Sequence, residues 1–355
     1  MSKKILVGMS GGVDSSMCAH LLLKDGYEVA GANCRFFNME DVTPNKACCS
    51  EDAVKDAAEV AKRLGIDFYV FDFSKAFRKN VIDNFIDTYV NGATPNPCIE
   101  CNKHLKFNKM LEKAIEMGFD YIATGHYASI EYNKETNRYL LKKGADEKKD
   151  QSYVLYSLNQ FQLSHTIFPL GKLLKSEIKE TAEKEGLYSV KKGESQDICF
   201  VPDGNYSAFI ERQTGKAFPE GNFVSTDGKI LGTHKGIIRY TIGQRRGLGL
   251  ALPAPLYVYK KDLKNNLVIL SSEDKLFSKE LDAENVNFIP FDRLEEPMRV
   301  MAKVRYKQAA QWATITQTGE NKVHVEFDLP QRAIAKGQAV VFYSGDYVVG
   351  GGTII

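Results

Sequence analysis

Three cysteines in this 355-residue chain have the type and spacing for thiol chemistry. Cys98 and Cys101 stand three residues apart, and Cys199 lies far downstream in an irregular stretch. By spacing alone, Cys98 and Cys101 could be half of a zinc site completed by Cys48 and Cys49. They could equally be a dithiol redox pair or packed core residues, and the spacing leaves these alternatives open.

The wider cysteine usage favours reactive thiols over structural disulfides. Seven cysteines is an odd number for a long chain without a secretory signal, which argues against a disulfide framework. Cys98 and Cys101 precede a helical pattern that includes Phe107 and ends at Gly118. A thiol at a helix N-terminus, with Lys103 nearby, should have a lowered pKa.

A second chemical candidate is the N-terminal run Ser10-Gly-Gly-Val-Asp-Ser15, which follows the apolar segment 5–9. Adjacent glycines allow a sharp turn and close approach to a ligand. Asp14 or Ser15 could cap the helical pattern that follows, and a helix N-terminus suits a phosphate group. The run is not a Walker A loop, because no Gly-Lys-Ser/Thr follows it.

The elements that must position these residues alternate between strand and helix. Strands are expected at 5–9, 27–33, 68–73 and 121–124, with helices after Asp14, at 50–64 and from Phe107. Such alternation indicates an α/β fold with a parallel sheet covered by helices on both faces. Ligands of such sheets bind beyond the carboxyl ends of the strands. Ser10–Ser15 and Gly125-His126 both fall there.

The remainder of the chain becomes rich in β-structure. A hairpin is expected over 128–142, helices over 152–158 and 175–185, and an irregular piece over 191–204. Later strands are expected at 300–306, 313–318, 323–327, 339–343 and 347–349, forming one small β-barrel. The predicted domains are 1–210 (nucleotide-binding, catalytic), 211–284 (small, β-rich) and 285–355 (barrel).

Bulk properties limit the choice of partners and location. The net charge is only +2, so affinity for nucleic acid must come from local basic patches. Candidates are Lys148-Lys149, Arg245-Arg246, and Lys303, Arg305 and Lys307 with Tyr306 and Trp312. The N-terminal apolar run is too short for a signal peptide or a membrane span, so we expect a cytoplasmic protein without membrane contact.

The glycine turn resembles the PP-loop of the ATP pyrophosphatases, enzymes that cleave ATP to AMP and pyrophosphate. Together with the motifs that follow it along the chain, it is similar to the bacterial tRNA-specific 2-thiouridylase family, which thiolates the wobble uridine of certain tRNAs. The motifs are Cys48–Asp52, Thr94–Pro97, Cys101–Lys103, Thr124–Tyr127, Lys149–Tyr153, Ser195–Cys199 and Tyr240–Arg246.

The resemblance implies that ATP is a substrate, with Mg²⁺ expected beside it and no permanent metal or iron–sulfur cluster. It implies that ATP adenylates the C2 oxygen of uracil, and that Cys199 carries a persulfide from a donor protein. Cys101 is then the nucleophile, which pairs with Cys199 in a transient disulfide. ATP contacts implied by the family are Gly8, Met9, Ser10, Gly11, Gly12, Val13, Asp14, Ser15, Cys34 and Gly125.

The resemblance also implies that domain 211–284 binds tRNA and that further residues contact it. The target base would be splayed out of the tRNA anticodon loop. The implied residues are Asn96, Pro97, His126, Lys149, Asp150, Gln151, Arg305, Tyr306 and Gln338. One departure stands out: Cys98 occupies a position that is usually Asp in the family. Cys98 is either a weaker acid–base group or an extra resolving thiol. No role follows for Cys48 and Cys49.

Three other functions fit parts of the pattern. A PP-loop ligase or amidotransferase would share the glycine turn but would not need two distant cysteines. A thiolase with an iron–sulfur or zinc centre would use Cys98 and Cys101 as ligands. A nucleotide-regulated RNA-binding module would use the basic residues without catalysis. Loss of function on replacement of Cys101 or Cys199 would distinguish a 2-thiouridylase from a ligase or amidotransferase.

Overall fold

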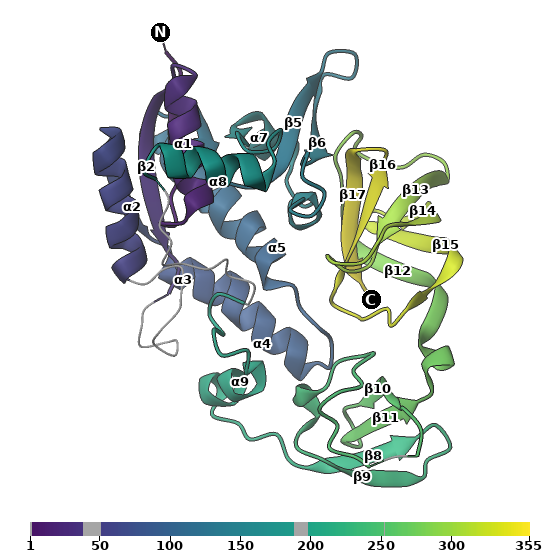
Figure 1. The fold of residues 1–355 in the computed structure, drawn as a ribbon. Coiled ribbons are helices and arrows are strands. Elements are labelled where there is room, and N and C mark those ends of the chain that lie inside the picture. The colour runs from purple at the N-terminus through teal and green to yellow at the C-terminus, as the bar shows by residue number, and fades with distance from the viewer. Residues whose placement is uncertain (1, 38–50, 188–197, 252) are drawn as a thin grey trace.

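The computed structural model describes residues 2–37, 51–187, 198–251 and 253–355. Cys48, Cys49 and residues 195–197 of the Ser195–Cys199 motif lie outside the described residues. The described chain forms three sheets, which belong to an N-terminal α/β unit, a small central unit and a C-terminal barrel (Figure 1).

The N-terminal sheet is parallel throughout and has the strand order β3-β2-β1-β4-β7. Its strands are β1 (Lys4–Gly8), β2 (Glu28–Arg35), β3 (Phe68–Asp72), β4 (Tyr121–Ala123) and β7 (Thr166–Ile167). The four predicted strands are therefore confirmed, and β7 adds one at the edge. The order places β1 in the centre, so the Ser10–Ser15 turn that follows it lies in the middle of the carboxyl edge.

Helices cover both faces of this sheet because β1 is apolar on both sides. Ile5 and Val7 pack with α1 and α2, whereas Leu6 packs with the helical segment around Met110. The helices are α1 (Val13–Lys24), α2 (Glu51–Leu64), α3 (Ser74–Phe77), α4 (Asp83–Val90), α5 (Pro97–Cys101), α6 (Met110–Glu116), α7 (Gln160–Ser164) and α8 (Lys175–Lys184). Two π-helical pieces, Arg78–Ile82 and Asn102–Lys109, join α3 to α4 and α5 to α6.

Two of the predicted helices differ in the structure. The segment predicted as a helix over 152–158 has only one 3-10 turn, Ser152–Val154, because it is packed between two units rather than on one helical face. The helix that contains Phe107 begins at Pro97, ten residues before Phe107. Proline is favoured in the first turn of a helix, where its missing N–H costs nothing. Cys98 and Cys101 therefore lie within the helix, not before it.

The central unit is a four-stranded sheet with the order β10-β11-β8-β9, preceded by α9 (Tyr206–Thr214). Its strands are β8 (Gly221–Ser225), β9 (Ile230–His234), β10 (Tyr257–Asp262) and β11 (Leu267–Ser271). Phe223 and Val258 of this sheet share one hydrophobic cluster with Phe77 and Phe85 of the N-terminal unit. The central unit is thus packed against the α3–α4 region and not merely tethered to it.

The C-terminal unit is a closed barrel of six strands, since β12 pairs with both β15 and β17. The strands are β12 (Phe277–Phe288), β13 (Met298–Lys303), β14 (Gln311–Gly319), β15 (Lys322–Arg332), β16 (Ala339–Ser344) and β17 (Tyr347–Ile354). The predicted barrel is confirmed. The first strand, β12, was not predicted, and it spans the expected domain boundary at 285.

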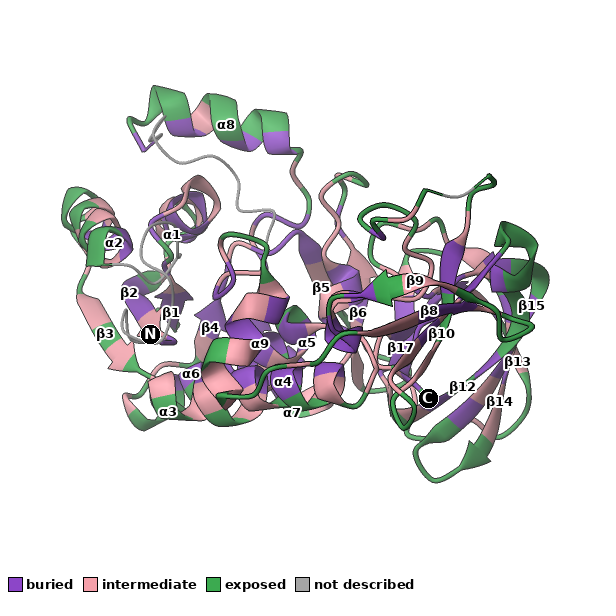
Figure 2. Ribbon diagram, turned by 90° about the horizontal axis from the view of Figure 1, so that it is seen from below, coloured by how far each residue is buried: buried purple, intermediate pink, exposed green. Residues whose placement is uncertain are grey.

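A hairpin from the N-terminal unit extends this barrel sheet. The predicted hairpin is confirmed as β5 (Ala128–Asn133) and β6 (Arg138–Lys143), and β6 pairs with β17 through Lys142 and Tyr347. Beside the hairpin the two units share one core. Tyr153, which is fully buried, donates its hydroxyl hydrogen to the Ala339 carbonyl at 2.8 Å. Figure 2 shows the buried residues that continue from the parallel sheet through the hairpin to the barrel.

This shared core predicts a measurable cost for a small change. Tyr153→Phe should lower the free energy of unfolding by about 1–2 kcal/mol, since the Ala339 carbonyl loses a buried partner. Urea denaturation of the full chain would measure it. Tyr132→Phe, on the exposed hairpin, is the matched control and should change stability by less than about 0.5 kcal/mol. Equal stability of the two variants would contradict the role of Tyr153.

Candidate functional site

The turn after β1 is shaped by close backbone packing. Gly11 has φ of +75°, and a Cβ there would lie 2.7 Å from the Ala53 carbonyl oxygen of α2. A side chain at position 11 would therefore be strained and would collide with backbone. The turn leads directly into the N-terminus of α1, where backbone N–H groups can bind an anion.

Hydroxyl groups fix this turn from inside. The Ser15 hydroxyl accepts from the Ser10 N–H at 3.1 Å and donates to the Gly12 carbonyl at 2.9 Å. The expectation that Asp14 or Ser15 caps α1 is wrong: the N-cap is Gly12, and no side chain caps the helix. The side chains instead hold the turn or, for Asp14, reach a cation.

Asp14 is joined to a lysine that the sequence did not single out. Lys175, the first residue of α8, places Nζ 2.6 and 2.7 Å from the two carboxylate oxygens of Asp14. Tyr127 donates its hydroxyl hydrogen to Asp14 Oδ1 at 2.7 Å. The Lys175 side chain is 11% exposed, so a nearly buried cation lies at the mouth of the glycine turn. A Cβ on Gly125 would lie 2.8 Å from the Asp14 backbone, which fits the small residue there.

The other family-implied ATP contacts lie at the same edge. Gly8 ends β1, Met9 and Val13 flank the turn, and Cys34 lies at the end of β2. Asn33 donates to the Met9 carbonyl at 2.8 Å, while its own Oδ1 is buried without a partner. Burial raises the pKa of the Cys34 thiol to about 12, with a smaller contribution from Cys101, which places these two thiols within electrostatic reach.

The thiol-bearing helix holds its two cysteines in different environments. Cys98, the second residue of α5, is exposed, whereas Cys101 is only 8% exposed. Residues three apart lie on one helix face, so the two side chains occupy adjacent turns. Figure 1 shows α5 between the parallel sheet and the barrel. The side chain at position 98 is therefore accessible and that at 101 is packed.

Cys199 borders the same hydrophobic cluster as Cys101, although the two are far apart in sequence. The following residue, Phe200, anchors it: its ring lies 5.1 Å from that of Phe85 and 5.3 Å from that of Phe209. Cys199 itself is half-buried, and both Cys101 and Cys199 are thiols in the structure. The fold thus brings the two expected reactive cysteines to one cluster.

Most of the family-implied tRNA contacts lie on the seam between the N-terminal unit and the barrel. Several of these side chains are hydrogen-bonded within the protein. Gln338 donates to the carbonyls of Thr94 and Pro95, both at 3.0 Å, and Arg305 donates to the Ala333 carbonyl at 2.7 Å. Asp150 accepts from Ser152 and Gly144, and Gln151 accepts from the Tyr127 N–H. Asn96 and Lys149 are half-buried, Pro97 is buried, and Tyr306 is 37% exposed.

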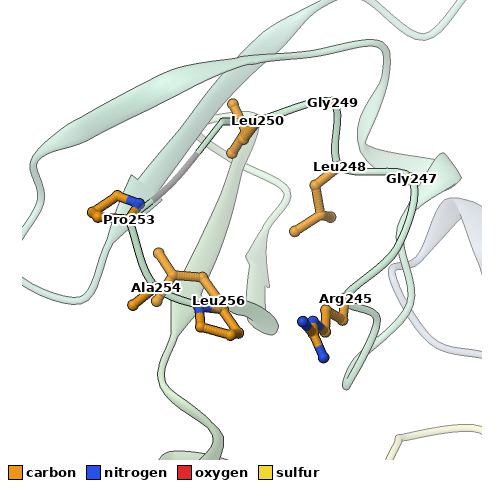
Figure 3. Close-up of a pocket in the computed structure, with 9 residues that line it drawn as sticks. Arg245, Gly247, Leu248, Gly249, Leu250, Pro253, Ala254 and Leu256 are labelled. Atoms are coloured by element: carbon orange, nitrogen blue, oxygen red, sulfur yellow. The ribbon is translucent and has the colours of Figure 1, made fainter.

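One further feature lies outside this seam. A hollow of about 340 Å³ opens in the loop after β9 of the central unit, and Figure 3 shows Arg245 and Leu248 on one side of it. Within residues 2–37, 51–187, 198–251 and 253–355, no group of three or more His, Cys, Asp or Glu side chains could hold a metal ion. Over the same ranges, no helix has the length and apolar character to cross a membrane.

His126 is 8% exposed, and its Nδ1 lies 2.7 Å from the Thr124 hydroxyl. Burial, with a smaller effect of Lys106, lowers the pKa of His126 well below its ordinary value of 6.5. The folded protein therefore keeps this imidazole neutral, whereas the unfolded chain takes up a proton as the pH falls below 6.5. The stability that follows is fully present above pH 6.5 and is lost on acidification.

His126→Gln should reduce this acid sensitivity. Between pH 7.5 and 5.5 the unchanged protein should lose about 1 kcal/mol more unfolding free energy than the variant does. Urea midpoints at the two pH values would measure the difference. Identical pH profiles for His126→Gln and the unchanged protein would refute the assignment.

Three family profiles match successive parts of the chain. They are described as a tRNA methyl transferase HUP domain (residues 3–203), a tRNA methyl transferase PRC-barrel domain (207–272) and an aminomethyltransferase beta-barrel domain (278–354). Among solved structures, a 4-thiouridine synthetase–RNA complex with bound ATP is 18% identical, with a TM-score of 0.36 over 60% of this chain and 50% of that one. Structural similarity at this level carries no argument about the family of this chain.

Full-length relatives are much closer. The tRNA-specific 2-thiouridylase MnmA of Acetivibrio thermocellus is 52% identical over 355 residues, which is 99% of each chain. The protein of the same name from Clostridioides difficile is 50% identical over 100% of this chain and 98% of that one. The match extends over all three units described above. The chain therefore belongs to the tRNA-specific 2-thiouridylase family.

Proposed function

We propose that this enzyme replaces the C2 oxygen of the wobble uridine of tRNA with sulfur, using ATP and a persulfide on Cys199. The observation that carries the proposal is that Cys101 and Cys199 belong to or border one hydrophobic cluster. That cluster also borders Cys34 near the end of β2, the strand next to β1, which leads into the glycine turn. A ligase or an amidotransferase would require no such pair of thiols. The names of the full-length relatives support the same reaction.

ATP would bind with its phosphates at the turn 10–15. The close approach at Gly11, the N-terminus of α1 and the cation of Lys175 all suit a polyphosphate. Both oxygens of Asp14 are bonded to Lys175, so the turn offers no carboxylate that is free of a cation. Mg²⁺ would accordingly be bound mainly by the phosphates of the nucleotide, as is common for this ion.

The chemistry follows from the poor leaving ability of the uracil oxygen. The C2 oxygen attacks the α-phosphorus of ATP, and pyrophosphate leaves. The terminal sulfur of the Cys199 persulfide then attacks C2, and AMP leaves with the former uracil oxygen. The Cys101 thiolate attacks Sγ of Cys199, which breaks the persulfide S–S bond, leaves the sulfur on the base and forms a Cys101–Cys199 disulfide. A dithiol reductant restores both thiols, and a donor protein persulfide reloads Cys199.

The position of α5 suits an entering base. Cys98 is exposed as the second residue of this helix, after Pro97 at the first position and Asn96 at the N-cap. Burial raises the pKa of Tyr306 on the barrel side, with smaller electrostatic contributions from Asp150 and Cys98. A flipped uridine could thus reach α5 between the N-terminal unit and the barrel.

Mass spectrometry of substrate tRNA tests the proposal directly. The tRNA would be incubated with the protein, ATP, Mg²⁺ and a persulfide donor, and then digested to nucleosides. Exchange of one oxygen for one sulfur at the wobble uridine is the expected result, with one pyrophosphate released for each sulfur added. A product with an added methyl group, or no modified nucleoside, would overturn the proposal.

Cys101→Ser and Cys199→Ser should each reduce thiolation at least about 1000-fold, because a hydroxyl cannot take part in persulfide exchange. Cys18→Ala is the matched control. Burial in α1 raises the pKa of the Cys18 thiol and keeps it protonated, so this variant should retain activity. Initial rates of thiouridine formation would measure all three. A fully active serine variant at 101 or 199 would refute the proposed division of roles.

Cys98→Asp and Cys98→Ser separate the two roles suggested for Cys98. If this thiol acts in proton transfer, Asp should restore most of the activity that Ser loses, because a carboxylate can exchange protons and Ser cannot. If it resolves the disulfide, both variants should complete a first turnover and slow at later ones when reductant is limiting. Single- and multiple-turnover rates would distinguish these outcomes. Full activity of Cys98→Ser under both conditions would exclude both roles.

A further inference from the structure

The outer face of strand β13 is covered over only part of its length. Alternate residues of this strand point into the barrel, where Val300 and Ala302 belong to the barrel core. Arg299, Met301 and Lys303 are therefore on the outer face. Met301 pairs in register with Tyr343 of β16 on one side and with Trp312 of β14 on the other.

The covered and uncovered parts differ in chemistry. Tyr343 is fully buried in the core shared with the N-terminal unit, and Met301 packs against that core. Trp312 is 53% exposed, although it lies directly beside Met301. It is the single tryptophan of the chain. The N-terminal unit thus stops one strand short and leaves a large aromatic ring facing solvent.

A cation and an aromatic ring are fixed together at this uncovered edge. The Arg299 guanidinium carbon lies 5.4 Å from the centre of the Trp312 ring. Two hydrogen bonds to Asp328, at 2.8 and 2.7 Å, and one to Thr314 at 3.2 Å hold the guanidinium in place. Asp328 neutralises the charge of Arg299. The guanidinium plane and the Trp312 ring therefore offer a surface for stacking and little net positive charge.

This surface continues along β13 to the seam between the N-terminal unit and the barrel. Four residues after Arg299, Lys303 Nζ lies 6.0 Å from the ring centres of both Tyr153 and Tyr306. Tyr306 donates its hydroxyl hydrogen to the Asp150 carbonyl at 2.9 Å. Aromatic and basic groups therefore extend from Tyr153 and Tyr306 in the seam along β13 to Trp312 on β14.

We propose that Trp312, supported by Arg299, is a stacking platform for a single-stranded nucleotide of the substrate tRNA other than the uridine being modified. The inference rests on the proposed function for the identity of the RNA. Single-stranded RNA is recognised by unstacked bases lying on aromatic side chains and on guanidinium planes, with basic groups meeting the backbone. Trp312, Arg299 and Lys303 supply these three groups in one row.

Tryptophan fluorescence gives a direct test, since one residue accounts for all of it. An unmodified anticodon stem-loop RNA would be titrated into the unchanged protein without ATP, so that no turnover occurs. Stacking should quench the fluorescence in proportion to binding. Trp312→Ala should weaken binding about 5- to 100-fold, and Trp312→Phe by less than about 5-fold, as measured by filter binding. Phe277→Ala, at an exposed aromatic on strand β12 across the barrel, is the control and should bind normally.

Salt dependence separates stacking from charge. Trp312→Ala should leave the slope of log K against log salt unchanged, because stacking releases no counterions. Lys303→Met should make that slope shallower by about 0.7 if Lys303 meets one phosphate. Thiolation by Trp312→Ala should show a raised KM for tRNA with kcat unchanged.

Retained RNA binding without any fluorescence change, or with normal affinity in Trp312→Ala, would overturn the platform and would leave the proposed function intact. That outcome would also be expected if the ring instead served a protein partner. Quenching by the RNA in a protein that never thiolates it would uphold the platform and contradict the proposed function. A protein that does not bind the RNA at all would contradict both.

Discussion

The site depends on one contact between distant parts of the chain, which fixes where the thiol-bearing helix begins. Residues 336–338 of the barrel side hold residues 94–95: the Thr94 N–H donates to the Lys336 carbonyl at 2.8 Å, and Gln338 donates to the Thr94 and Pro95 carbonyls. A Cβ on Gly337, where φ is +85°, would lie 2.9 Å from the Thr94 oxygen. These contacts hold the backbone just before Pro97, and so help to position the start of the helix that carries Cys98 and Cys101.

Packing then decides what each thiol can do. Cys101 is enclosed by the cluster that also contacts Cys199, whereas Cys98 is exposed. On the other side of the sheet edge, Lys175 and Tyr127 hold Asp14 beside the glycine turn. The glycine turn proposed to bind ATP and the Cys98–Cys101 pair thus lie at the starts of two different helices of the N-terminal unit, α1 and α5.

The sequence was sufficient for the elements whose residues carry their own local signal. We could predict the strands at 5–9 and 121–124 because their continuous apolar runs reflect burial on both faces of the sheet. The Gly11-Gly12 turn was predicted because a sharp backbone turn needs glycine, and the barrel strands because alternating residues mark a sheet buried on one face. Lys175 could not be singled out, because a lysine that opens an amphipathic helix is ordinary in sequence. Its role comes from the packing of α8 against α1.

The misses also have physical causes. Ser152–Leu158 has helical spacing of apolar residues, but Tyr153 and Leu155 are both fully buried, since the segment is enclosed by two units. The predicted cap at Asp14 or Ser15 failed because α1 begins at Val13, so both residues lie inside its first turn and the N-cap position falls on Gly12. In the first case a local preference yields to tertiary packing, and in the second the glycine turn is shorter than expected.

The hairpin β5–β6 limits how this protein can lose a domain during evolution. Its last strand joins the barrel sheet, and the apolar faces of Tyr153, Val341 and Tyr343 close on each other. A gene that lost the segment encoding the barrel would leave this hydrophobic surface of the N-terminal unit exposed to solvent. The truncated protein would aggregate, and it would not persist as a simpler nucleotide-binding enzyme. The barrel is for that reason a part that evolution can alter but cannot easily discard.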